Sequence, residues 1–334
     1  MRRLVAVMAG VVALGGALPA RAQAPETVGI RIVDVPTSRT DDPRARQYIV
    51  DHLAPGSTIT RRVEVSNDTS EPQVVQFYAG AATIADGSIV FGEGRAPSDV
   101  TTWTTVDPPT VSPAAGAKVQ ASVTIAVPAD ASPGERYGVV WAELAPAVPP
   151  EGGITAVNRV GVRIYLSVGE GNEPASDFAI TALEARRDDE GRPVLAATVQ
   201  NTGGRAVDLS GELRLTNGPG GLSAGPFTAK LGTTLGLGQS EPVLVVLDPA
   251  IPDGPWDARI VLRSGMTERD ATASITFPET AGTAGRPVST KADTDGPPVV
   301  PLAVGAAAIV VAVGVVAQGR SRRRRAGRAS QLGG

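Results

Sequence analysis

Lys118–Val127 reads Lys-Val-Gln-Ala-Ser-Val-Thr-Ile-Ala-Val, and this stretch decides the fold class. Its odd-numbered positions, from Val119 to Val127, are all apolar, whereas most of the even-numbered positions are polar. Successive side chains of a strand leave on opposite faces, so the alternation predicts a strand with one face buried and the other in water. Between residues 26 and 278 no stretch sustains a helical period, which predicts an all-β chain.

Other short runs with strand-like patterns occur along the chain, and Pro (28) and Gly (39) supply many turns between them. Strands at this spacing with turn signals between them are typical of β-sandwiches. The further candidate strands are Ile59–Val65, Val74–Ala79, Tyr137–Leu144, Arg159–Val168, Val194–Val199, Val207–Leu215, Val243–Leu247, Ala258–Arg263 and Ala273–Phe277.

The chain also repeats itself loosely. Val63–Thr69 is echoed by Ala197–Gly203, each a strand that runs into an Asn turn, and Val127–Gly134 is echoed by Leu247–Gly254, each a Pro/Gly turn. We therefore predict two tandem immunoglobulin-like β-sandwiches, at residues 26–168 and 170–278. Gly169–Ser176, rich in Gly, Glu and Pro, is the predicted hinge between them.

The first 22 residues are typical of a signal peptide. Two arginines follow Met1, then comes the uncharged, apolar run Leu4–Leu18, and small residues mark a cleavage site after Ala22 or after Ala24. This pattern predicts that the chain is exported. A membrane-spanning helix is disfavoured here, because the apolar run is too short to cross a bilayer.

The other end predicts a membrane anchor. Val299–Ala317 holds 19 uncharged, mostly apolar residues and precedes the Arg-rich segment Arg320–Arg325. Positive charge beside a span stays on the cytoplasmic side. We therefore predict a flexible stalk at 279–298, one transmembrane helix at 299–317, a cytoplasmic tail at 318–334, and a plasma-membrane location with the N-terminal part outside. Phe277–Gly282 faintly resembles a cell-wall sorting signal, so covalent attachment to the wall is the alternative.

Composition excludes several classes of function. The absence of Cys rules out disulfides and sulfur ligands for a metal. All 34 acidic residues lie between Glu26 and Asp295, where only 22 Lys and Arg lie, so this part of the chain is acidic. An acidic surface argues against nucleic acid as a partner, because nucleic-acid binding needs a basic face.

Six pieces of the first predicted module occur in the order and spacing of a known family. They are Tyr48–Val50 with Leu53–Gly56, Val63–Asn67 with Ser70–Pro72, Ala85–Gly87, Thr102–Thr105, Val127–Gly134 and Arg159–Leu166. Together they resemble the peptidoglycan-binding domain of the WxL-interacting proteins of Gram-positive bacteria, over about residues 28–168. The second module is only loosely similar to the family's partner-binding domain, and Leu237–Pro242 stands where the family's signature is expected.

The resemblance implies a membrane-anchored cell-surface scaffold without enzymatic activity. Its first module would bind peptidoglycan or another cell-wall glycan, and its second would bind a WxL-type or other exported surface protein. The alternative is a subunit of an exported multiprotein surface complex that does not bind glycan directly.

The sequence offers little for catalysis. His52 is the single histidine, it has no recognisable catalytic partner, and we predict no catalytic residue, metal site or cofactor. A wall hydrolase that uses His52 is a third hypothesis. Asp188-Asp189 could bind Ca²⁺, although the alternating ligand spacing of a calcium loop is missing.

Three aromatic residues of the first module are the candidate ligand-binding residues: Trp103, Tyr137 and Trp141. Tyr137 and Trp141 share one face of a predicted strand with Val139, a pattern that also suits the core of a sandwich, and we expect Trp141 in the core. The tract from Ala85 to Pro109 has no counterpart in the second module, so a functional loop is expected there.

Overall fold

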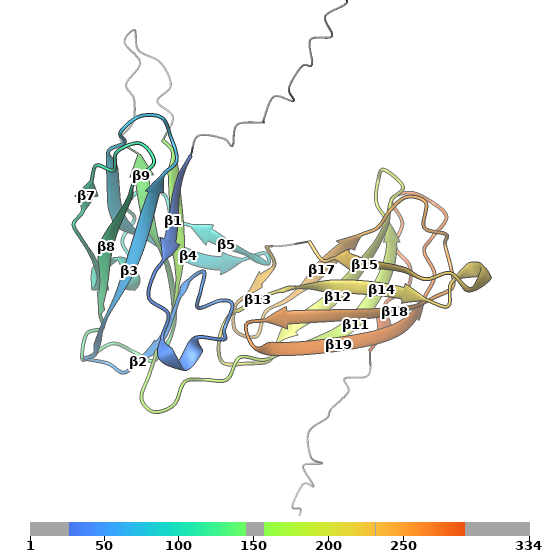
Figure 1. Cartoon of the computed structure of the whole chain (residues 1–334). Helices are drawn as coiled ribbons and strands as arrows, with labels where there is room; N and C mark the ends of the chain where they lie inside the picture. The colour runs from blue at the N-terminus through green and yellow to red at the C-terminus, as the bar shows by residue number, and fades with distance from the viewer. Residues whose placement is uncertain (1–26, 145–156, 231, 291–334) are drawn as a thin grey trace, which may run out of the picture. The chain divides into compact units, whose positions relative to one another are not determined.

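The computed structural model describes residues 27–144, 157–230 and 232–290. Over these residues the chain is all-β, as predicted: strands account for nearly all regular structure, beside one short helix, α1 (Asp99–Trp103), and two 3-10 turns, η1 (Thr37–Arg39) and η2 (Pro219–Gly221). The larger sheets form two sandwiches, whose strands run from blue to green and from yellow to orange in Figure 1.

The first sandwich packs a four-stranded sheet against a six-stranded one around a common core. Adjacent strands pair antiparallel, except that β2 runs parallel to β10. In sheet order, the strands are β1 (Val28–Ile32), β3 (Thr58–Asn67), β8 (Lys118–Ala126) and β6 (Thr104–Asp107), then β2 (Ile49–Leu53), β10 (Arg159–Val168), β9 (Gly134–Leu144), β4 (Val75–Ala85) and β5 (Ser88–Phe91), with β7 (Thr110–Val111) beside β4.

The strand predicted from Lys118–Val127 is confirmed as β8. Its inward residues Ala121, Val123 and Ile125 are at most 3% exposed, and Lys118 and Gln120 on the opposite face are exposed. Burying a Val or Ile side chain is worth about 1.5–3 kcal/mol, so this face contributes much of what holds the two sheets together.

The second sandwich has its own core, which includes Trp256, 1% exposed, and Phe178. Its sheets have the orders β17-β12-β11-β20 and β15-β14-β18-β19, and β13 pairs with β16 at one end. The strands are β11 (Phe178–Arg187), β12 (Pro193–Asn201), β13 (Val207–Asp208), β14 (Ser210–Thr216), β15 (Ala224–Thr228), β16 (Thr234–Leu235), β17 (Ser240–Val246), β18 (Trp256–Ser264), β19 (Thr267–Ile275) and β20 (Val288–Ser289).

The structure describes the first part of the predicted stalk at 279–298. Residues 280–290 lie along β11: Gly285 donates its N–H to the carbonyl of Ala185, and Val288 and Ser289 pair with Leu183 and Ala182. These backbone bonds complete the edge of the sheet, which explains why a segment of low apolar content is ordered here.

The predicted leader (1–22), membrane span (Val299–Ala317) and tail (318–334) lie outside the described residues. Within the described ranges no helix is long and apolar enough to cross a membrane. The described residues therefore give no support to the predicted single-pass plasma-membrane location or to the membrane as a partner.

Candidate functional site

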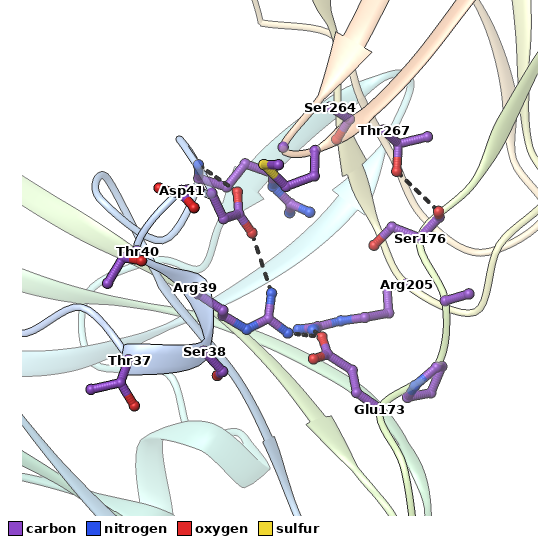
Figure 2. Close-up of a pocket in the computed structure, with 16 residues that line it drawn as sticks. Thr37, Ser38, Arg39, Thr40, Asp41, Glu173, Ser176, Arg205, Ser264 and Thr267 are labelled. Atoms are coloured by element: carbon purple, nitrogen blue, oxygen red, sulfur yellow. Dashed lines mark hydrogen bonds and ion pairs between the residues drawn. The ribbon is translucent and has the colours of Figure 1, made fainter.

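A polar cleft of about 570 Å³ opens where residues of both sandwiches meet (Figure 2). Its walls come from the loop around η1, from the segment that connects β10 to β11, from the turn after β12, and from the turn between β18 and β19. The lining residues are Thr37–Asp42, Arg44, Glu173–Ser176, Arg205 and Ser264–Thr267.

Arg205 forms the floor of the cleft, and its side chain is 2% exposed. The turn that carries it is held by Asn201, whose side-chain amide donates to the carbonyl of Arg205 at 2.8 Å. The guanidinium contacts two carboxylates, with Nε 3.4 Å from Oε1 of Glu135 and Nη1 against Glu173. A buried charge is tolerated only when it is paired, so these two carboxylates are what permits an arginine here.

Glu135 is the buried partner, on β9 of the first sandwich, and its side chain is 4% exposed. Its Oε2 accepts two hydrogen bonds at 2.7 Å, from the hydroxyl of Tyr137 and from the backbone N–H of Ala206. Burial raises the pKa of Glu135, and these two hydrogen bonds oppose the rise. Glu135 therefore joins a strand of one sandwich to a turn of the other.

A second ion pair lies beside the first. Arg44 Nη2 is 2.8 Å from Oδ2 of Asp208, and Arg44 Nη1 donates to the carbonyl of Ala206 at 2.8 Å. Asp208 Oδ1 accepts from the hydroxyl of Tyr165 at 2.7 Å, and burial together with this carboxylate raises the pKa of Tyr165. Arg44 also lies over the Tyr165 ring, 4.6 Å from its centroid, a cation–π contact.

Apolar contacts and one hairpin complete this junction. Val50, Tyr165 and Ala206 are each at most 2% exposed and form a cluster to which residues of both sandwiches contribute. The turn between β4 and β5 reaches the second sandwich, where the N–H of Thr234 donates to the carbonyl of Gly87 at 2.8 Å. Ion pairs, apolar contacts and backbone bonds thus fix the walls of the cleft.

The rim differs from the floor. Arg39 of η1 pairs with Asp42 at 3.2 Å and also contacts Glu173, as Figure 2 shows. On the opposite side the Met266 side chain is exposed (71%) at the tip of the β18–β19 turn. The predicted hinge is therefore tied down, because Glu173 and the carbonyl of Ser176, which accepts from Thr267 at 3.1 Å, both bond to neighbouring elements.

The cleft has the groups for binding, and its charged groups are occupied by one another. Asp42 and Glu173 lie against arginines, and the described part of the chain contains no cluster of three metal-ligating side chains. Arginine does not exchange protons in the physiological range, so Arg39 and Arg205 are poor candidates for acid–base catalysis. Hydroxyls from Thr37, Ser38 and Thr40 can still bond a ligand, because they are exposed.

The three predicted aromatic residues are not brought together in one site. Trp103 ends α1 and packs, half-buried, against the core of the first sandwich. Tyr137 belongs to the junction through its hydrogen bond to Glu135. Trp141 lies in a separate cluster with Tyr78 and Val139.

Trp141 is buried, as expected, but it does not lie between the two sheets. On β9 it is Val140 and Ala142 that join the core, so Trp141 lies on the outer face of the sheet, where it is 7% exposed. Glycines of the two neighbouring strands leave room for its ring: a Cβ on Gly80 would come within 2.5 Å of the indole. Arg159 then covers the ring, with its guanidinium 4.3 Å from the ring centroid.

His52 lies on β2 at the edge of its sheet. Its Nδ1 is 3.1 Å from the hydroxyl of Ser167, and its Nε2 is buried without a hydrogen-bond partner. Ser167 is 2% exposed, so its hydroxyl is not open to a substrate.

The sequence analysis did not identify the residues that build the cleft. Arg205 stands four residues after Asn201 in the repeated Asn turn, immediately before the apolar pair Ala206-Val207. A charged residue beside apolar positions in a tight turn is the one signal that could have marked it.

Comparison with known proteins gives a likeness in structure only. No family model matches the chain, and no curated protein matches it. Among solved structures, the CupB2 chaperone of Pseudomonas aeruginosa is 11% identical and covers 68% of this chain and 97% of its own, with a TM-score of 0.37. The E. coli chaperone DraB is 13% identical, with coverages of 69% and 95% and a TM-score of 0.37. The class 5 fimbriae chaperone CfaA is 15% identical, with coverages of 69% and 97% and a TM-score of 0.33.

These comparisons overturn the resemblance on which the predicted function depended. The chain matches no family model, that of the WxL-interacting proteins included. The predicted surface scaffold, its alternative as an exported complex subunit, and the peptidoglycan and WxL-type partners lose their basis with it, because they depended on that resemblance. At these identities and TM-scores, the likeness to chaperones says nothing about function here.

Proposed function

We propose that this chain is a non-enzymatic protein-binding module that holds a segment of a partner polypeptide in the cleft between its two sandwiches. One observation carries the proposal: the protein's own buried contacts fix the walls of the cleft. Its walls belong to both sandwiches and are joined by the buried pairs of Arg205 with Glu135 and of Arg44 with Asp208. A preformed site avoids the entropic cost of ordering its walls on binding.

The chemistry of the lining suits a peptide. Exposed hydroxyls of Thr37, Ser38 and Thr40 can bond the N–H and carbonyl groups of an extended chain. Charges of both signs and the exposed Met266 side chain add contacts for polar and apolar side chains. The volume of about 570 Å³ lies within the range of small-ligand sites and is enough for a few side chains.

Selection of peptides against a matched pair of variants tests this proposal. A random peptide library is selected on purified residues 26–290, and the isolated binders are titrated against Thr40→Trp and Thr272→Trp. Thr40 is exposed and lines the cleft, so an indole there fills it. Thr272 is exposed on β19 and does not line the cleft, so its variant adds the same bulk elsewhere.

We expect the peptides to lose at least about tenfold in affinity for Thr40→Trp, equivalent to about 1.4 kcal/mol, and to bind Thr272→Trp as they bind the wild type. Peptides that bind both variants equally well, or a library that yields no binder, would overturn the proposed function.

A further inference from the structure

Glu173 differs from Asp42 and Glu135 because it contacts both arginines of the cleft, Arg39 and Arg205. Arg39 has Asp42 at 3.2 Å, and Arg205 has Glu135 at 3.4 Å, so each guanidinium already has a carboxylate of its own. Oε1 of Glu173 contacts both arginines, as the third carboxylate on two cations (Figure 2). These two arginines and three carboxylates together carry a net charge of minus one.

The three carboxylates are held with unequal firmness. Glu135 belongs to β9, is 4% exposed and has two further hydrogen bonds. Glu173 belongs to a segment without helix or strand, and its side chain is 34% exposed on the side of the cleft. Release of Glu173 would need only a local change in a loop, whereas release of Glu135 would leave a buried charge unpaired.

The arginines themselves would stay in place if Glu173 left. Arg205, 2% exposed, keeps Glu135 and lies near the carbonyls of Asp51 and Tyr165, at 3.4 and 3.5 Å. Arg39 keeps Asp42. The two guanidiniums would then present a vacant position for one carboxylate, the anion that a pair of arginines binds with good geometry.

We propose that Glu173 is an exchangeable internal ligand of Arg39 and Arg205, and that an acidic side chain of the partner polypeptide enters the cleft by displacing it. A fourth carboxylate could not simply join the other three, because like charges at this spacing repel one another strongly. Glu173 thus restrains the cleft and selects partners that bring a carboxylate. This inference rests on the proposed function and adds to it the chemistry that the cleft recognises.

Removal of the Glu173 charge tests the exchange. The probe is a fluorescein-labelled hexaglutamate peptide, with hexaglutamine as the neutral comparison, titrated by fluorescence anisotropy at low salt against full-length protein. Glu173→Gln keeps the shape of the side chain and removes its charge. Glu170→Gln is the matched control, because Glu170 is exposed in the same segment, its loss changes the net charge equally, and it does not line the cleft.

We expect Glu173→Gln to bind hexaglutamate about tenfold more tightly than the wild type or Glu170→Gln does. Its affinity for hexaglutamine should equal that of the wild type. Adding Arg39→Gln to Glu173→Gln should remove the gain, and Arg39 is on the rim, so this variant spares the buried Arg205. Equal gains for both glutamate variants, or a gain that survives Arg39→Gln, would overturn the exchange.

Failure of this inference and failure of the proposed function are distinguishable. If selected peptides are sensitive to Thr40→Trp and Glu173→Gln brings no gain for hexaglutamate, the cleft binds polypeptide without the exchange. If no peptide is selected on the wild type and Glu173→Gln still gains affinity for hexaglutamate through Arg39, the arginines bind a carboxylate once Glu173 is neutral, and the wild-type cleft does not hold polypeptide as proposed.

Discussion

Two buried asparagines close equivalent turns in the two sandwiches with nearly the same hydrogen bonds. Asn67, 0% exposed, donates its side-chain amide to the carbonyls of Glu71, Pro113 and Ala114 at 2.8–3.1 Å. Asn201, 1% exposed, donates to the carbonyls of Arg205, Leu235 and Gly236 at 2.8–3.1 Å. Each side-chain oxygen also accepts the N–H two residues on, at 3.1 Å from Thr69 and 3.0 Å from Gly203.

The two turns differ in the residue four places after the asparagine. In the first sandwich this is Glu71, which is exposed, and in the second it is Arg205, which is buried at the floor of the cleft. The same turn therefore places an exposed glutamate at the end of the first sandwich and a buried arginine at the junction in the second. The fold supplies the turn, and the side chain at this one position decides whether the turn has a role in the site.

Replacement of Arg205 should have the largest effect. Arg205→Met leaves Glu135 buried without its cation, and breaking one side of a buried ion pair costs about 3–5 kcal/mol of unfolding free energy. The equivalent change Glu71→Met, at an exposed position, should alter it by no more than about 0.5 kcal/mol. Urea unfolding of both variants measures the difference, and equal losses would remove the contrast between the turns.

Asn201→Ala should cause the next largest loss of unfolding free energy. It removes the amide from the carbonyls of Arg205 and Leu235, and the unsatisfied buried groups make a loss of about 3 kcal/mol reasonable. The N–H of Gly203 keeps the carbonyl of Asp177, and the carbonyl of Gly236 keeps the N–H of Gln239. Because the turn also positions Arg205, the Arg39-dependent gain of hexaglutamate binding in Glu173→Gln should fall as well. Unfolding of the second sandwich can be followed on Trp256 by fluorine NMR of protein labelled with 5-fluorotryptophan, since Trp256 is its single tryptophan.

Asn67→Ala should cost less, about 2 kcal/mol, because the hydroxyl of Thr69 still donates to the carbonyl of Glu71 at 2.9 Å. Hexaglutamate binding in the Glu173→Gln background should not change, since this turn does not line the cleft. Fluorine signals of Trp103 and Trp141 report the unfolding of the first sandwich. A loss of binding with Asn67→Ala would show that any weakening of either sandwich disturbs the cleft, and the second turn would then have no special role.

The Asn turns also show which parts of the structure could be predicted from the sequence. The likeness of Val63–Thr69 to Ala197–Gly203, together with the alternation of Lys118–Val127, predicted two sandwiches because local periodicity reports burial directly. The cleft could not be predicted in this way. Arg205 and Glu135 are 70 residues apart, and nothing in either neighbourhood indicates that they meet.

The sequence did not predict that Trp141 lies on the outer face of its sheet, and the reason is different. Gly138–Ala142 are five successive buried residues, because the core covers one face of β9 and an aromatic cluster with arginines covers the other. Alternation cannot tell the inner face from the outer one when both are buried. The glycines that make room for the ring lie on two other strands, so their relation to Trp141 exists only in the folded chain.

The smallest expected effect is a pH dependence that belongs to the second turn alone. Glu135, which pairs with Arg205 and accepts from the N–H of Ala206, has a pKa raised by burial above its ordinary value of 4.5. At the first turn the corresponding carboxylate, that of Glu71, is exposed. A folded-state pKa above the unfolded one means that the native protein binds this proton more tightly. The contribution of Glu135 to stability is therefore present below about pH 4.5 and is lost as the pH rises through the folded-state pKa.

Glu135→Gln removes this titration and keeps an acceptor for the N–H of Ala206. The unfolding free energy of the variant should accordingly decline less than that of the wild type as the pH rises from 4.5. Urea unfolding at several pH values, with Glu71→Gln as the matched change at the first turn, measures the two slopes. If Glu135→Gln and Glu71→Gln change the slope equally, burial at the junction is not what perturbs Glu135; if only Glu135→Gln does, the docking of the second turn is the source of the pH dependence.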